Sequence, residues 1–251
     1  MKGSLKFWKK SGKELMLHLD TDGGFLVVPS APSLCQTSKD ATLLRAHLEA
    51  DHAVVDSGYL WLLLACTGNY SLPRISGHQL MEIVLAPSNE SSVPFRQRKI
   101  LWVVPDPEEQ SRIALLLASL DFKDANQHYY QAPHYAQESD FQDEALVESV
   151  ASAKPDWIVL CIGGGRQEKL GAYLRGKLGR RPVILATGGA VSFFTGGQAS
   201  IPRLGDRLFL GWFFRIMDNP RRFLPRYVQA LSLPLALWRI NRSVARRSWA
   251  S

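Results

Sequence analysis

The chain alternates short apolar runs with segments whose apolar residues recur at helical spacing. The runs suit strands buried on both faces, and they are "GGFLVVP", "HAVVD", "KILWVVP", "WIVLCI" and "RPVILA". Strands that alternate with helices are typical of a parallel sheet with helices packed on both sides. The sequence therefore predicts an α/β fold with a mostly parallel sheet covered by helices on both faces.

A polar, turn-rich segment, residues 86–97, interrupts this alternation and predicts a boundary between two halves. We expect residues 1–96 to form an N-terminal α/β half. Residues 97–200 are expected to form a Rossmann-like half. Residues 201–251 are predicted to form a basic helical C-terminal appendage.

Local signals predict how several segments begin and end. Asp40 is a good N-cap for a helix over "ATLLRAHLEA", and another helix is expected to begin near Ser76. The segment "YLWLLLACTG" is predicted to be a buried helix. Residues 127–142 are rich in histidine and tyrosine and are predicted to form a loop.

The cysteine and histidine patterns give no sign of a metal site or a disulfide framework. Cys35, Cys66 and Cys161 are odd in number and lack metal-ligand spacing, which favours a reducing compartment. The six histidines are scattered, so we expect no structural metal and no cofactor. The longest apolar run, residues 60–66, is far shorter than a membrane span, and the basic start lacks the apolar core of a signal peptide. A soluble or peripheral membrane protein is expected.

Positive charge is concentrated at the end of the chain. Residues 201–251 hold ten arginines, no lysine and two acidic residues, a net charge of +8, whereas residues 1–200 hold 20 basic and 21 acidic residues. Aromatic residues are interleaved with the arginines, which suits an anionic membrane surface. Arginine also suits phosphate groups, single-stranded nucleic acid is a rival partner, and a solvated helix face is the plain structural alternative.

A glycine turn follows one predicted strand, in the stretch "PDWIVLCIGGGRQEKL". Gly163 and Gly164 end the apolar run, and Gln167 and Glu168 open a predicted helix. A strand, a glycine turn and a helix start can hold a phosphate or sugar against backbone amides. The spacing matches neither the dinucleotide fingerprint nor the P-loop, so a tight turn without a ligand remains the alternative.

Three candidate features should meet at one edge of the sheet, because parallel strands end together. These are Asp56, the turn at 163–168 and a second glycine turn at 188–192. A carboxylate such as Asp56 at that edge suits a general base. Asp56 in Asp-Ser-Gly is also a common cap of the following turn, which is the structural alternative.

These pieces resemble the WecB/TagA/CpsF family of bacterial glycosyltransferases between about Phe25 and Tyr227. Four blocks carry the resemblance, in this order: Asp56-Ser57-Gly58; Pro73, Arg74, Ser76 and Gly77 in "LPRISG"; Pro155, Asp156, Gly163, Gln167 and Glu168; and Trp212, Arg215, Pro220, Arg221, Arg222, Arg226 and Tyr227 in "GWFFRIMDNPRRFLPRY".

The resemblance implies an inverting transfer of a sugar from a nucleotide-diphosphate donor, such as a UDP-sugar, to a polyprenyl-diphosphate-linked acceptor. It implies that Asp56 is the general base and that Arg74 steadies a phosphate or sugar. The residues expected to bind the donor are Ser30, Gly163, Gly164, Gln167, Glu168, Gly188 and Gly189. The arginines expected to meet the lipid diphosphate are Arg215, Arg221, Arg222 and Arg226.

The family works in cell-surface polysaccharide synthesis, so the resemblance implies a cytoplasmic protein that lies peripherally on the inner face of the membrane. The resemblance is compatible with a homo-oligomer. It implies a reaction that needs no metal, and a protein with no nucleic-acid partner. Several family positions differ in this chain: Val28 and Ser30 replace Thr and Asn, Ser192 replaces Asp, and Gly211 replaces Glu. These departures keep open a non-catalytic protein that binds nucleotide-sugars or lipid phosphates.

Overall fold

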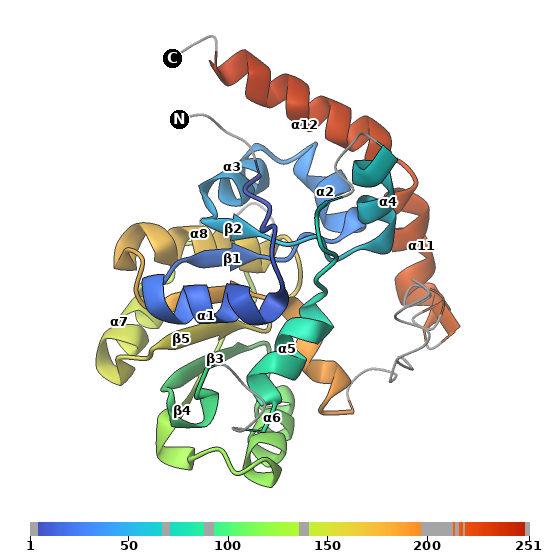
Figure 1. Ribbon diagram of the computed structural model, residues 1–251. Helices are drawn as coiled ribbons and strands as arrows, with labels where there is room; N and C mark the ends of the chain where they lie inside the picture. The colour runs from blue at the N-terminus through green and yellow to red at the C-terminus, as the bar shows by residue number, and fades with distance from the viewer. Residues whose placement is uncertain are drawn as a thin grey trace.

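The computed structural model describes residues 5–66, 71–87, 93–135, 141–196, 213, 216–217 and 219–248, without the side chains of 222–223 and 243–248. Its strands form a single six-stranded sheet in which every neighbouring pair is parallel (Figure 1). In spatial order the strands are β2 (His52–Ala53), β1 (Phe25–Val27), β6 (Val183–Ala186), β5 (Trp157–Leu160), β3 (Ile100–Val104) and β4 (Gln127–Gln131). The predicted parallel α/β fold is confirmed.

Helices cover both faces of the sheet, and the strands supply alternate residues to each side. On one face Trp102 packs with α1 (Gly12–Asp22), α5 (Gly77–Leu85) and α6 (Pro107–Ser119). On the other face Leu101 and Val103 pack with helices α7 (Glu144–Ala153) and α8 (Arg166–Leu178), and α3 (Ala41–Glu49) lies beside α8. Three short 3₁₀ helices complete the elements of the sheet region: η1 (Phe95–Gln97), η2 (Asp124–Asn126) and η3 (Gly188–Phe193).

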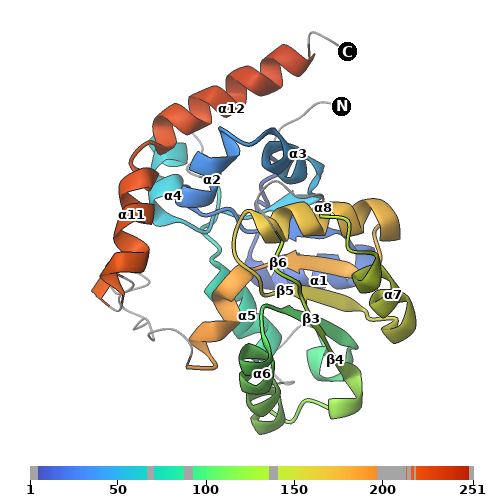
Figure 2. The same ribbon diagram turned by 180° about the vertical axis from the view of Figure 1, so that it is seen from behind.

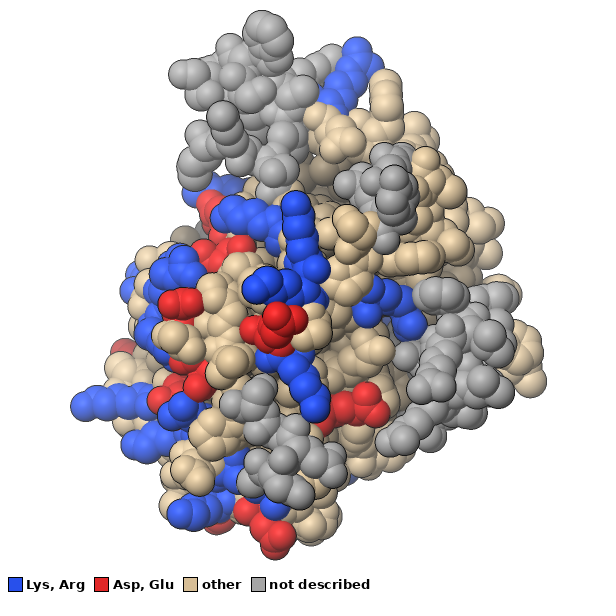
Figure 3. Space-filling model, viewed as in Figure 1, with Lys and Arg blue, Asp and Glu red and all other residues tan. Residues whose placement is uncertain are grey.

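A third apolar cluster lies beyond the edge strand β2 and joins the two ends of the chain. It is built from α2 (Ala31–Thr37), α4 (Gly58–Cys66), α11 (Pro220–Ala230) and α12 (Leu233–Ser248). Figures 1 and 2 both show α11 and α12 wrapping around α2 and α4. The expected C-terminal helices are therefore present. The surface over α4 shows few charged side chains in Figure 3.

The local predictions were correct for the capped helices and wrong at two segments. Asp40 and Ser76 are N-caps of α3 and α5, as expected. Residues 127–142 do not form only a loop, because Gln127 to Gln131 pair in register with all of β3. The helix α4 is only partly buried: Leu60 is buried, Leu62 and Cys66 are exposed, and the other six residues are half-buried.

Strands from both predicted halves belong to the same sheet. β1 lies between β2, from the first half, and β6, from the second half. The division of the chain at residues 96 and 200 stays a prediction. What the shared sheet does settle is that the strand ends of both halves face the same edge.

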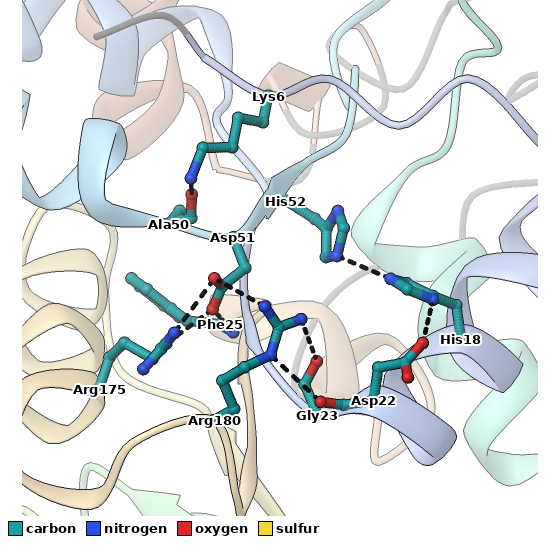
Figure 4. Close-up of polar contacts among 10 residues, drawn as sticks. All are labelled: Lys6, His18, Asp22, Gly23, Phe25, Ala50, Asp51, His52, Arg175 and Arg180. Carbon is teal, nitrogen blue, oxygen red and sulfur yellow. Dashed lines mark hydrogen bonds and ion pairs between the residues drawn. The ribbon is translucent and has the colours of Figure 1, made fainter. Parts of the chain in front are cut away.

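A polar cluster at the amino edge of the sheet ties α8 to the first two strands (Figure 4). Asp51 accepts hydrogen bonds from the backbone N–H of Phe25 at 2.9 Å and from Arg175 Nε at 2.7 Å. Burial opposes ionisation of Asp51, but the hydrogen bonds from Arg175 and Phe25 and the charge of Arg180 outweigh it and hold its pKa below the usual value. The cluster is a structural clamp at the edge opposite the strand ends.

Beside this clamp, two histidines are in direct contact, with 3.1 Å between their Nε2 atoms. His18 Nδ1 lies 2.7 Å from Asp22 Oδ2, so His18 donates its Nδ1 proton to Asp22. Trp8 stacks on His18 at 5.1 Å between ring centroids. At least one of the two imidazoles is neutral at this contact, because one Nε2 must accept the hydrogen bond that the other donates.

Stability is expected to fall in mild acid because of this pair. Burial, and then the charge on His18, lower the pKa of His52 below its ordinary value of 6.5. Below that ordinary value the unfolded chain takes up the proton more readily than the folded protein does, so the free energy of unfolding decreases as the pH falls through 6.5 toward the lowered pKa. Urea unfolding at about pH 7.5, 6 and 5 should show a shallower decrease in His52→Gln than in the native protein. An equal decrease in both proteins would assign the acid sensitivity to other groups.

Candidate active site

The carboxyl edge of the sheet collects the predicted site residues. Ser30 follows β1, Asp56 follows β2, Gly163 follows β5 and Gly188 follows β6. The chain leaves β3 toward β4 and leaves β5 toward β6, so the connections diverge between β3 and β5. Such a point of divergence is the usual ligand site of open parallel sheets.

Asp56 lies at the N-terminus of α5. Its Oδ1 accepts a hydrogen bond from the backbone N–H of Gly77 at 2.9 Å, and Arg74 Nε donates to its backbone carbonyl at 3.3 Å. A parallel bridge between Val55 and Arg74 holds the two segments together. The partial positive charge of a helix N-terminus stabilises an anion at this position.

The structural alternative for Asp56 was a cap of the turn that follows it. In the structure the hydroxyl of Ser57 takes that place and accepts from the backbone N–H of Leu60 at 3.3 Å. The Asp56 carboxylate instead reaches a helix 21 residues further along the chain. The half-buried carboxylate thus faces the N-terminus of α5 and not packed hydrocarbon.

The turn after β5 presents bare backbone outward and is held from behind. Gly163 and Gly164 are exposed, and no described atom would touch a β-carbon at either position. Gly165 has a φ of 87°, which favours glycine. The Glu168 carboxylate accepts from the Gly165 N–H at 2.6 Å and is itself 1% exposed. Glu168 therefore holds the turn from the inside.

Gln167 meets the second glycine turn. Its side chain is 4% exposed, and its Nε2 donates to Glu168 at 3.3 Å, whereas Oε1 has no hydrogen-bond partner among the described residues. A β-carbon on Gly188, whose φ is 61°, would lie 3.3 Å from that Oε1. The buried hydroxyl of Thr187 likewise has no described partner. Buried polar atoms are normally hydrogen-bonded, so the two mark a place that a polar ligand or water can complete.

Gly77 connects Asp56 to this second turn. A β-carbon on Gly77 would lie 3.3 Å from Cβ of Ala190 and 3.6 Å from the carbonyl oxygen of Thr187. Asp56 bonds to the N–H of the same glycine. Asp56 is therefore hydrogen-bonded to the start of α5, and α5 packs against η3, the turn that lies beside Gln167. The structure brings these predicted residues into one region of the carboxyl edge.

Two hydroxyl side chains at positions where this chain differs from the family form hydrogen bonds within the protein. Ser30 is the N-cap of α2 and accepts from the Ser33 N–H at 3.4 Å. Ser192 donates to Glu109 Oε1 at 2.6 Å. Val28, a third position where the chain differs from the family, is 8% exposed and packs in the core.

Glu109 is a residue of this edge that the sequence analysis missed. It opens α6 directly after β3, is 5% exposed, and pairs with Arg112 at 3.0 Å. Its carboxylate holds the second glycine turn through Ser192. The signal in the sequence was a capped helix start, "DPEE", immediately after a predicted strand, which places an acidic residue at the carboxyl edge.

The structure describes only some of the predicted C-terminal arginines. Arg221 and Arg226 are exposed on α11, which packs against α2, the helix that begins beside Ser30. Arg222 lies in α11 with its side chain outside the described part, and Arg215 and Gly211 lie outside the described residues. No helix in the described part of the chain is long and apolar enough to cross a membrane.

Fold and site together define a parallel α/β protein with its candidate site at the carboxyl edge of the sheet. The model of the glycosyl transferase WecG/TagA/CpsF family matches residues 8–250, so the chain belongs to this family. Over 92 residues the chain is 34% identical to N-acetylglucosaminyldiphosphoundecaprenol N-acetyl-beta-D-mannosaminyltransferase of Bacillus subtilis (strain 168). This match covers 34% of the chain and 36% of the relative, about a third of each. The resemblance found in the sequence is confirmed.

Proposed function

We propose that the protein is an inverting glycosyltransferase that moves a sugar from a UDP-sugar to a polyprenyl-diphosphate-linked sugar, in the synthesis of a cell-surface polysaccharide precursor. The observation that carries this proposal is the link from Asp56, through the start of α5, to the η3 turn beside Gln167. Membership of a glycosyl transferase family supports the reaction class. The name of the Bacillus subtilis relative describes transfer to a sugar linked to a polyprenyl diphosphate, which supports the acceptor class.

In this proposal the donor diphosphate lies against the exposed backbone of Gly163 and Gly164, near the N-terminus of α8. Gln167, Gly188 and Gly189 bind the nucleotide-sugar, and Glu168 keeps the turn in place. Asp56 takes the proton from the acceptor hydroxyl as that oxygen attacks the anomeric carbon. The bond from this carbon to the diphosphate oxygen breaks in the same displacement, so the configuration inverts and the nucleoside diphosphate departs.

The C-terminal arginines complete the proposed site at an anionic membrane. Arg221 and Arg226 are exposed on α11, and residues 219–251 contain no acidic residue. Guanidinium groups bind phosphate oxygens in pairs, which suits the diphosphate of a lipid-linked acceptor. We place the protein on the inner face of the bacterial cell membrane for this reason.

A second candidate function, non-catalytic binding of a nucleotide-sugar, is favoured by one observation. The hydroxyls of Ser30 and Ser192 are bonded within the protein, and Val28 has no polar group for a donor. This alternative predicts saturable binding of a UDP-sugar with no product.

A transfer assay separates the two candidates. A panel of UDP-sugars would be incubated with the protein and a polyprenyl-diphosphate-linked sugar, and extended lipid would be detected by mass spectrometry. The glycosyltransferase proposal predicts a product whose new linkage has the anomeric configuration opposite to that of the donor. A bound donor that never yields product across the panel would favour the non-catalytic protein.

A further inference from the structure

Helix α4 leaves an apolar surface open to solvent. Its sequence, "GYLWLLLAC", contains no charged residue, yet Leu60 alone is buried. Leu62 is 48% exposed, and Cys66 at the end of the helix is also exposed. Tyr59, Trp61, Leu63 and Leu64 are only partly buried against the third apolar cluster. The helix therefore keeps apolar surface that another apolar phase can cover.

The C-terminal helices also expose apolar side chains. The buried residues Ala230, Leu233, Ala236 and Ile240 pack in the same cluster as Leu60. Another row of large apolar residues is exposed: Leu224 and Val228 on α11, Leu231 in the turn between the helices, and Leu235 and Trp238 on α12. Both ribbon views show α4 beside the junction of α11 and α12, and all three helices contribute to the third apolar cluster (Figures 1 and 2).

The charges around this region identify its partner. There is no acidic residue in residues 58–75 or 219–251. Arg221, Arg239 and Arg242 are exposed on α11 and α12, and Arg242 lies over the ring of Trp238 at 5.1 Å. A second copy of the chain would bring arginines against arginines, which opposes association. A bilayer with anionic headgroups offers hydrocarbon to the leucines and opposite charge to the arginines.

We propose that α4 enters the boundary between headgroups and acyl chains of an anionic bilayer, alongside the exposed row on α11 and α12. The proposal rests on the membrane association given under the proposed function and assigns part of it to the N-terminal region, not to the arginine-rich tail alone. Asp56 precedes α4 by two residues. Seating α4 in the bilayer therefore fixes Asp56 at the membrane surface, where the hydroxyl of a lipid-linked sugar is presented.

Cys66 supplies a native probe of this contact, because Cys35 and Cys161 are buried. A nitroxide label on Cys66 would be compared in solution and on vesicles of phosphatidylglycerol and phosphatidylcholine. On vesicles, its collision rate is expected to rise with oxygen and fall with a water-soluble nickel chelate. A label on Leu17→Cys, in a Cys66→Ser background, is the control, because Leu17 is 47% exposed on α1, on the face of the sheet covered by α1, α5 and α6.

Membrane affinity gives an independent measurement. Leu62→Gln is expected to weaken vesicle binding by about threefold to tenfold, because part of a leucine side chain loses its apolar surroundings. Leu17→Gln, at matched exposure, should leave it unchanged. Equal affinity of Leu62→Gln and native protein, a Cys66 label that stays accessible to the nickel chelate on bound protein, or no vesicle binding would each overturn the proposal.

The proposed reaction is tested separately from this contact. Transfer to a water-soluble, short-chain acceptor should be the same for Leu62→Gln and the native protein. If neither protein transfers sugar while the Cys66 label enters the bilayer, the membrane contact stands and the glycosyltransferase proposal fails.

Discussion

Replacing Asp56 with asparagine is expected to lower the rate of sugar transfer by about a hundredfold to ten-thousandfold, the range that a general base contributes. Asparagine keeps an oxygen that can accept from the Gly77 N–H, now 2.9 Å from Asp56 Oδ1, so the N-terminus of α5 should remain in place. An amide cannot take the proton of the acceptor hydroxyl. Initial rates with a saturating donor measure the loss, and thermal unfolding checks the fold.

Asp121→Asn is the matched control for this substitution. The Asp121 side chain is 92% exposed, and its positive φ of 58° is one that asparagine tolerates. Its transfer rate and its unfolding temperature should equal those of the native protein. Equal rates in Asp56→Asn and the control would remove Asp56 from the mechanism.

The largest effect on stability is expected from Gly171→Ala in α8. A β-carbon there would lie 2.4 Å from Cε2 of Phe25, a ring that is fully buried in β1. The helix and the strand cannot both keep their positions, so the free energy of unfolding should fall by about 1–3 kcal/mol. Because α8 begins beside Gln167, donor binding should weaken in the same variant.

Gly176→Ala, in the same helix, should act in the opposite direction. Apart from its chain neighbours and the backbone of its own helix, no described residue has an atom within 4 Å of a β-carbon at Gly176. Alanine is a better helix former than glycine by up to about 1 kcal/mol, so this variant is expected to unfold at higher denaturant concentration than the native protein. Urea unfolding of both variants gives the comparison, and destabilisation of equal size in the two would show that Phe25 does not set the cost at Gly171.

Much of the fold could be predicted from the sequence because it depends on local signals. The apolar runs gave the strands, and Asp40 and Ser76 marked the starts of α3 and α5. Parallel order then placed Asp56 and Gly163 at the same edge. The family followed from short blocks in the right order and was confirmed over residues 8–250.

What could not be predicted depends on contacts between distant segments. Leu62 looks like a core residue in sequence, and only the position of α4 outside the sheet leaves it exposed. The sequence of β4, "QHYYQ", lacks the apolar run that predicts a strand. As an edge strand it needs few apolar residues, and its pairing with β3 supplies its hydrogen bonds. Glu109 reaches Ser192 across 83 positions of sequence, and no local pattern encodes that contact.

Amide hydrogen exchange with and without a bound UDP-sugar tests whether the carboxyl ends of the strands form a single donor site. A single donor site predicts slower exchange at residues 161–168, 186–192 and 74–78, with no change at the amino edge, residues 50–53 and 173–177. Saturable binding that slows exchange only at the amino edge, or in only one of the three segments, would contradict a shared cleft at the carboxyl edge.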